Sequence, residues 1–341
     1  MKKPIALILT DTHLKPDNIS LVENIFDQAI AKCKELKIDT ILHGGDWFNS
    51  RTGQPLSVLK ATQRIIDKFK DNKIMVAIIA GNHDRTDYDS EDSFLDVFNS
   101  TIFVVIRDYS NVHFGNINVH FLPFFKESGS YMQRLQDINI DTKETNILLT
   151  HVAINGVNNN DGSVQQDVVP ANAFAQFDKT LVGHFHNRQS FDQFPIHYIG
   201  STYQANFGED DQKGFTILYN DGSIEFIQSH FPLYIKYEIN VEQLTSKEIL
   251  QLQQEKQSGN NIRIKIKGDQ AKVKSFDTSL LTQAGISFDL SHNTVDKPLS
   301  DKEMSKNITH NKKSIVDAFK SFCSDNKITD NKYGLEKLKE I

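Results

Sequence analysis

The sequence predicts an α/β protein with a parallel sheet at its core, and two observations predict this class. Three short apolar runs rich in β-branched residues, at 5–10, 40–43 and 74–80, each end directly in polar residues. Two stretches with apolar residues at helical spacing separate these runs. Alternating strands and helices imply right-handed crossovers and parallel pairing, which brings the polar strand ends to one edge of the sheet.

Length and composition limit the class of protein further. A chain of 341 residues suits one large domain with an appendage. The net charge of −6 argues against coating nucleic acid by bulk charge, so any recognition of anions must be local. Two cysteines are too few for a disulfide framework, and no run approaches the roughly 20 apolar residues of a membrane span. We therefore expect a soluble protein of a reducing cytoplasm.

The first half of the chain carries the clearest helix signals. Ser20–Glu23 has the pattern of a capping box, and the apolar residues that follow it, including Cys33, recur at helical spacing. Cys33 is therefore expected in the core rather than as a nucleophile. A second helix is predicted to begin near Pro55, and a short one at 93–98.

The sheets are predicted to continue in further short runs bounded by turn residues. These are a hairpin within 112–125, a buried strand at 147–150 that ends in His151, a strand at 180–182, and a hairpin around Asn220-Asp221-Gly222. The polar segment from 155 to 167 is expected to be an exposed loop close to the strand ends. The core is predicted to end near residue 232.

Seven side chains at the predicted strand ends offer only oxygen and imidazole nitrogen. They are Asp11, His13, Asp46, Asn82, His151, His184 and His186. These donors suit Mn²⁺, Fe or Zn²⁺ and exclude soft thiolate chemistry. Seven ligands are too many for one ion but suffice for two that share a carboxylate, and such pairs activate water for attack on phosphorus.

A single histidine is more often structural than a ligand, so the metal interpretation depends on the joint placement of the seven at strand ends. Seven other histidines lack that placement and are interpreted as structural or surface residues. They are His43, His113, His120, His197, His230, His292 and His310.

The same residues resemble a known family. The sequence contains, in order, Asp11-x-His13, Gly45-Asp46, Gly81-Asn82-His83-Asp84, His151 and Gly183-His184-x-His186, which match the five motifs of the calcineurin-like metallophosphoesterases. The resemblance implies a core of central β-sheets flanked by helices, one metal held by Asp11, His13 and His186, and a second held by Asn82, His151 and His184. It also implies that Asp46 bridges the two ions, that His83 assists the leaving group, and that Asp84 orients His83.

A narrower resemblance concerns the segments Tyr198-Ile199-Gly200-Ser201, Phe207-Gly208-Glu209 and Lys213-Gly214-Phe215, which are similar to the SbcD nuclease subfamily. That subfamily includes the recombination nuclease subunits of T-even phages and the eukaryotic meiotic-recombination nuclease. The resemblance implies a nuclease domain at 1–232, a small α+β capping domain at 233–300, and a linker with a C-terminal helix at 301–341.

The subfamily also implies a function. It implies a Mn²⁺-dependent deoxyribonuclease, an exonuclease on duplex ends and an endonuclease on single strands, that acts on DNA as a homodimer with an SbcC-like ATPase in recombination, repair or replication. One position departs from the pattern. Asn49 stands where these nucleases usually have His or Asp, and an amide cannot exchange a proton near neutral pH, so His83 is expected to carry more of the proton transfer.

Two features after residue 232 leave alternatives open. Ile262, Ile264 and Ile266 alternate with Arg263, Lys265 and Lys267, which predicts a half-buried strand whose basic face either contacts DNA or is solvated. Farther along, Ile315, Ala318, Phe319 and Phe322 form a narrow apolar stripe on a predicted helix. This stripe either docks on the ATPase or packs back on its own chain.

Two other functions compete with the nuclease. A stand-alone metallophosphatase or cyclic phosphodiesterase would use the same core, but the segment at 207–209 and the C-terminal appendage disfavour it. A metal-free scaffold is also conceivable, and the complete ligand set argues against it.

Overall fold

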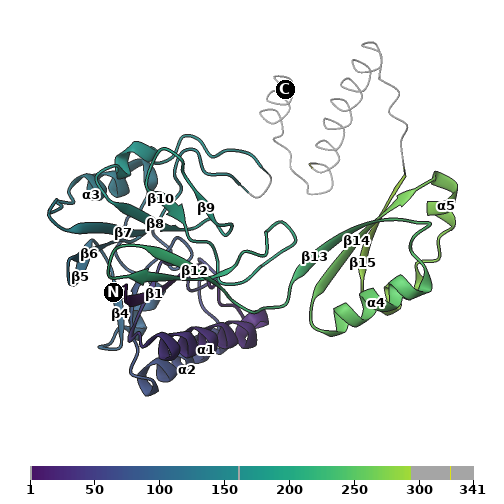
Figure 1. The fold of residues 1–341 in the computed structure, drawn as a ribbon, viewed down its shortest axis with the longest axis horizontal. Coiled ribbons are helices and arrows are strands. Elements are labelled where there is room, and N and C mark those ends of the chain that lie inside the picture. The colour runs from purple at the N-terminus through teal and green to yellow at the C-terminus, as the bar shows by residue number, and fades with distance from the viewer. Residues whose placement is uncertain (1, 160–161, 293–322, 324–341) are drawn as a thin grey trace, which may run out of the picture. The chain divides into compact units, whose positions relative to one another are not determined.

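A computed structural model describes residues 2–159, 162–292 and 323. The chain forms two compact units. The first contains Met1–Glu238, Leu244–Lys265 and Thr278–Asp289, and the second contains Ile239–Gln243, Ile266–Asp277 and the described residues from Leu290 on. Figure 1 shows the ribbon.

The first sheet has six strands in the order β12-β11-β1-β2-β3-β4. Their bounds are Ile224–Gln228 (β12), Gly214–Tyr219 (β11), Pro4–Leu9 (β1), Thr40–His43 (β2), Met75–Ile79 (β3) and Phe103–Ile106 (β4). β1 to β4 pair in parallel as predicted, whereas β11 pairs with β1 in the antiparallel direction. The predicted hairpin between β11 and β12 is confirmed, and this sheet is therefore mixed.

The second sheet also has six strands, in the order β5-β6-β7-β8-β10-β9. Their bounds are Ser110–Phe114 (β5), Ile117–Leu122 (β6), Thr145–His151 (β7), Lys179–Gly183 (β8), Ile196–Tyr198 (β10) and Gln189–Ser190 (β9). The strands from β6 to β10 pair in parallel, and the two edge strands are antiparallel. The predicted hairpin of β5 and β6 is confirmed.

The buried side chains form layers. Ile8 and Leu42 of the first sheet share one apolar cluster with Phe121 and Leu149 of the second, so the two sheets pack face to face. The opposite face of the first sheet is covered by helices α1 (Ile19–Leu36) and α2 (Leu56–Asp71), which lie side by side in Figure 1. A third cluster lies on the outer face of the second sheet, beneath helix α3 (Met132–Gln136). The predicted class, central sheets flanked by helices, is confirmed.

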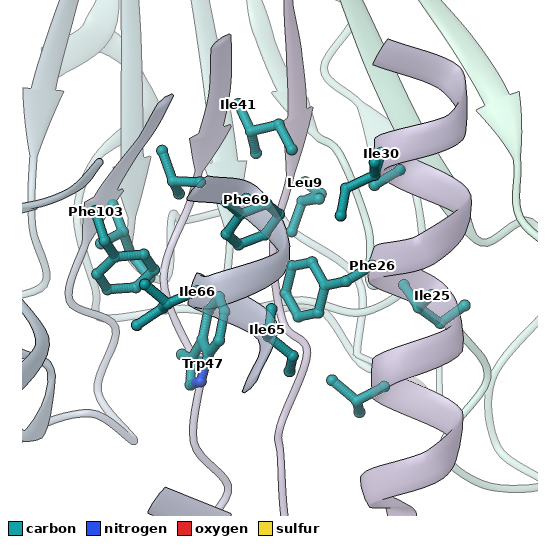
Figure 2. Close-up of a cluster of buried hydrophobic side chains, with 14 of the residues drawn as sticks. Leu9, Ile25, Phe26, Ile30, Ile41, Trp47, Ile65, Ile66, Phe69 and Phe103 are labelled. Carbon is teal, nitrogen blue, oxygen red and sulfur yellow. The ribbon is translucent and has the colours of Figure 1, made fainter. Parts of the chain in front are cut away.

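The cluster beneath α1 and α2 contains, among aliphatic side chains, the aromatic rings that Figure 2 labels: Phe26, Trp47, Phe69 and Phe103. Phe26 stacks on Trp47 with ring centroids 4.7 Å apart and meets the edge of Phe69 at 5.5 Å. Cys33 lies in the same cluster, where burial raises the pKa of its thiol to about 12, in agreement with a core role. The cluster fixes α1 and α2 against the strands whose ends carry the polar residues.

The predicted capping box at Ser20 is wrong. α1 begins at Ile19, directly after a 3₁₀ turn at Pro16–Asn18, so Ser20 lies inside the helix. The Asn18 side chain accepts a hydrogen bond from the backbone N–H of Lys15 at 2.8 Å and donates one to the His13 carbonyl oxygen at 2.9 Å. The Asn18 amide also donates to the distant Tyr203 hydroxyl at 2.7 Å, so its contacts hold the loop after β1 and the capping pattern at Ser20 does not decide where the helix begins.

The remaining elements are short. They are the 3₁₀ turns Phe94–Phe98 and Ala171–Phe174, a π-helical turn Glu127–Tyr131, helices α4 (Ser246–Gln257), α5 (Gln270–Ser275) and α6 (Ser279–Gln283), and a third sheet of β13 (Tyr234–Asn240), β14 (Asn261–Gly268) and β15 (Ser287–His292). The alternating strand at 262–267 is confirmed as β14. The predicted C-terminal helix, with Ile315, Phe319 and Phe322, lies outside the described residues. Within the described chain, no helix has the length and apolar character to cross a membrane.

Phe26→Ala tests the role of the aromatic cluster. We expect the free energy of unfolding to fall by roughly 3 to 5 kcal/mol, because a fully buried phenyl ring would leave a cavity between α1 and the sheet. Urea denaturation followed by circular dichroism measures the change. Lys34→Ala on the exposed face of the same helix is the matched control, with an expected change within about 0.5 kcal/mol. Equal losses for the two variants would contradict the assignment.

Candidate dinuclear metal centre

The carboxyl ends of strands from both sheets deliver the predicted ligands to one place. In the first sheet, Asp11 and His13 follow β1, Asp46 follows β2 and Asn82 follows β3. In the second, His151 ends β7, and His184 and His186 follow β8. The structure brings all seven side chains together within short contacts of one another.

Asp11, His13 and His186 form the first group, with one possible ligand atom each within 4.8 Å of the others. The Nε2 atoms of His13 and His186 face each other at 2.9 Å. Asp11 Oδ1 lies 3.7 Å from the first of these nitrogens and 3.9 Å from the second. This is the set that the sequence predicted for one ion.

Asp46, His151 and His184 form the second group. Asn82 belongs with them, because its Oδ1 lies 3.2 Å from His151 Nε2 and 2.9 Å from His184 Nδ1. The carboxylate of Asp46 also reaches the first group, since Oδ2 lies 3.3 Å from His151 Nε2 and 3.6 Å from His13 Nε2. Asp46 therefore occupies the position that a bridging carboxylate requires.

The hydrogen bonds of two histidines fit metal ligation. His151 Nδ1 donates to the Gly44 carbonyl oxygen at 2.9 Å, and His186 Nδ1 donates to the Glu209 carboxylate at 2.8 Å. In the neutral form of each ring the proton stays on Nδ1, and the Nε2 lone pair is then available to a metal ion. The donor set of carboxylate, amide oxygen and imidazole nitrogen is thus consistent with two divalent ions.

The charges in the cluster support cation binding. Burial would raise the pKa of Asp46, but the neighbouring His151, His13 and His83 together outweigh burial and hold that pKa well below its usual value. The carboxylates of Asp46 and Asp11 in turn outweigh burial of His151 and raise its pKa to about 9. Asp11 is shifted in the same direction, since its hydrogen bond with His13 and the nearby rings of His151 and His186 together outweigh burial. Burial lowers the pKa of His184 to about 4, with His151 adding to the shift, so that ring is neutral near pH 7. Ionised carboxylates and neutral imidazole are the forms that bind metal, so metal binding would displace the proton that His151 carries beside the carboxylates.

The backbone at the site is strained. Four predicted ligands have positive φ although none is glycine, and this region costs roughly 1 to 3 kcal/mol per residue. They are Asp11 (55°), His13 (42°), Asp46 (54°) and His184 (88°). Gly81 lies against Asp46 so closely that an added Cβ would come within 2.1 Å of Oδ1. The loops therefore approach one another as closely as their backbones permit.

His83 lies at the edge of the cluster and shares a candidate ligand group with His13 and Asp46. Its Nδ1 donates to the Asn49 carbonyl oxygen at 2.6 Å. The predicted role of Asp84 in orienting this ring needs correction. The Asp84 carboxylate accepts backbone N–H groups of Gly81, Trp47 and Phe48 instead, so it ties two loops together.

Sequence reasoning assigned no role to two residues that support the site. The Glu209 carboxylate accepts a hydrogen bond from His186 Nδ1 and another from the backbone N–H of Ala205. The fully buried Lys213 donates to the His186 carbonyl oxygen at 2.6 Å and lies 3.6 Å from the Glu209 carboxylate. No local signal marks either role, because Glu209 lies 23 residues from the histidine it contacts.

The basic face of β14 is only partly open to solvent. Arg263 and Lys265 are exposed, and Lys267 is half-buried. The Arg263 guanidinium lies 4.7 Å from the ring centroid of Phe207, within the same unit, and this ring also meets the edge of Tyr234. Arg263 therefore has a packing role in addition to any contact with DNA.

Glu209→Gln tests the support of His186. We expect the affinity for one of two divalent ions to fall roughly 10- to 100-fold, because the neutral amide makes the imidazole a weaker ligand. Calorimetric titration of the metal-free protein with Mn²⁺ measures this change. Glu35→Gln, an exposed carboxylate on α1, is the control. Affinities that match the wild type at both sites would show that Glu209 does not tune the ligand.

Two solved structures are similar to this chain. The crystal structure of a nuclease from Pseudomonas putida is 13% identical with a TM-score of 0.27, over 55% of this chain and 65% of the nuclease. The chain thus spans less than two thirds of that nuclease. A dimetal phosphatase from Danio rerio is 11% identical with a TM-score of 0.36, over 64% of this chain and 93% of the phosphatase. Likenesses at this level carry no argument about activity.

The family of the chain is shown by a match to a family model. The family model described as calcineurin-like phosphoesterase matches residues 6–188, which is more than half of the 341 residues. That range contains the β1, β2, β3, β7 and β8 strand ends and the seven side chains gathered there. The chain belongs to the calcineurin-like phosphoesterase family, and the side chains gathered at its strand ends form a candidate site for two divalent ions.

Proposed function

We propose that this phosphoesterase cleaves phosphodiesters, and that its substrate is DNA. The observation that carries the proposal is the position of the cluster between two hollows. One, of about 580 Å³, is lined by His13, Asp46 and His186, and the other, of about 250 Å³, by Asn82 and His184. A diester has two organic groups on phosphorus and suits two hollows, whereas a monoester needs only one.

The lining of the hollows favours a nucleotide chain. The smaller hollow is bordered by the half-buried rings of Tyr88 and Phe185, beside the buried Phe124. Aromatic rings of this kind stack on bases without regard to sequence, at roughly 1 to 3 kcal/mol per base. Lys15 and Arg51 line the larger hollow. Side chains with this charge bind the backbone phosphates of a nucleic acid strand. Phosphate recognition thus depends on a few cationic side chains beside the cluster, as the net charge of −6 on the whole chain requires.

The residues of the chain divide the chemistry among them. Two divalent ions, held by the two groups around Asp46, would supply Lewis acidity and an activated water. Glu209 fixes the proton of His186, and the Gly44 carbonyl oxygen fixes that of His151. His83 lies beside both groups and borders the larger hollow, where it is placed to meet a leaving oxygen. This role of His83 stays a prediction.

The finer assignment is to the SbcD nuclease subfamily, with Mn²⁺ as the metal. The segment that includes Phe207 and Glu209 supports this assignment, because it carries the resemblance and its Glu209 contacts a predicted ligand. We further propose that the protein acts as a homodimer with an SbcC-like ATPase, which binds the C-terminal helix at 301–341. DNA contact through Arg263, Lys265 and Lys267 belongs to the same proposal.

Substrate preference tests the proposal. With Mn²⁺, we expect circular single-stranded DNA and bis(p-nitrophenyl) phosphate to be cleaved at least about tenfold faster than the monoester p-nitrophenyl phosphate, a difference of about 1.4 kcal/mol in activation free energy. EDTA should abolish all three activities. A preference for the monoester would support a stand-alone phosphatase, and cleavage of the small diester without DNA would support a small-molecule phosphodiesterase.

Asp46→Asn and Asp11→Asn together test the bridge. We expect Asp46→Asn to weaken the binding of both ions and Asp11→Asn to weaken mainly one, because only a carboxylate readily spans two cations. Each substitution keeps the side-chain size, so circular dichroism should show that both variants fold. Calorimetric titration with Mn²⁺ gives the two affinities. Single-site losses of equal size in the two variants would refute the bridging role.

A further inference from the structure

Arg51 lies at the junction of the two hollows and lines both. It belongs to the loop between β2 and α2, five residues after Asp46 in the sequence. One end of its guanidinium lies 2.9 Å from His83 Nε2, and the other lies 3.2 Å from the Tyr88 hydroxyl. The side chain therefore bridges the strand-end loops beside the predicted metal ligands.

In both contacts Arg51 is the donor of the hydrogen bond. A guanidinium only donates hydrogen bonds, so His83 Nε2 accepts from Arg51, and the ring proton stays on Nδ1, which donates to Asn49. The two acceptors of the guanidinium, an imidazole and a phenol, are both neutral. Arg51 is exposed, so its charge is not buried in the fold.

Three other arginines of the described chain have carboxylate partners, while Arg85 and Arg188 donate to backbone carbonyl oxygens and Arg263 lies over the Phe207 ring. Arg64 pairs with Glu23 at 2.7 Å, and Arg134 pairs with Asp108 at the same distance. No carboxylate of the residues in 2–159 and 162–292 pairs with Arg51. Its positive charge thus has only neutral partners there, next to the cluster at which a phosphoester must react.

We propose that Arg51 is a substrate-binding residue that contacts a non-bridging oxygen of the phosphoester. Its guanidinium exchanges the hydrogen bonds to His83 and Tyr88 for charge-assisted ones to the anion, which are about twice as strong and can be bidentate. The exchange also uncovers the Nε2 atom of His83 toward the larger hollow. The inference rests on phosphoester hydrolysis at this cluster and applies to DNA and to small esters alike.

Binding of inorganic phosphate to the Mn²⁺-loaded protein tests the proposal. We expect Arg51→Ala to weaken phosphate binding in calorimetry by roughly 10- to 100-fold, with Mn²⁺ affinity unchanged. Arg51→Lys should recover only part of the loss, because an ammonium cannot bind in bidentate fashion. Arg64→Ala, which removes an arginine from the exposed face of α2, is the matched control and should bind phosphate like the wild type.

Hydrolysis of bis(p-nitrophenyl) phosphate provides the second readout. Arg51→Ala should lower kcat/KM by a similar factor, and inorganic phosphate should inhibit it less than it inhibits the wild type. Unchanged phosphate affinity in a folded, metal-loaded Arg51→Ala protein would overturn the proposal. So would a loss of Mn²⁺ affinity, which would show that Arg51 supports the cluster instead. A wild type that cleaves the small diester but not DNA would refute only the DNA substrate.

Discussion

Two buried carboxylates, Asp11 and Asp46, impose the constraint on which the site depends. Each is about 1% exposed, and an ionised carboxylate removed from water is stable only beside positive charge and hydrogen-bond donors. The backbone N–H of His184 binds Asp11, and that of His83 binds Asp46. The first hydrogen bond joins the loop after β8 of the second sheet to the loop after β1 of the first, and the second joins the loops after β2 and β3 within the first sheet. The groups that would hold metal therefore also connect the strand-end loops.

The strained backbone around these carboxylates has the same origin. Strand ends from two face-to-face sheets must turn inward over a few residues, which forces Asp11 and Asp46 into positive φ. Gly183 permits the approach, since an added Cβ would come within 2.7 Å of His151 Nδ1. The aromatic cluster beneath α1 and α2 keeps the first sheet in place against this strain, because Trp47 directly follows Asp46 and is fully buried.

The sequence predicted those parts of the fold and the candidate site that depend on local patterns. The spacing of apolar residues and the positions of turn residues predicted the strand ends and both hairpins. The gathering of the seven donor side chains follows from those strand ends. The features it missed are contacts between distant segments. Asn18 binds the distant Tyr203 hydroxyl while it holds the loop after β1, and α1 begins ahead of Ser20. Glu209 reaches His186 across 23 residues. Such contacts depend on tertiary packing, which overrides a capping pattern of about 1 kcal/mol.

The departure at Asn49 has less effect on His83 than the sequence suggested. The structure orients the ring through the backbone carbonyl oxygen of Asn49, and every residue type at that position has such an oxygen. The proton of His83 is therefore held on Nδ1 whichever side chain stands at position 49, and Nε2 faces Arg51. What an amide at position 49 removes is a titratable neighbour, not the orientation of His83. A cationic side chain two residues later then becomes the group that stands between His83 and an incoming phosphoester.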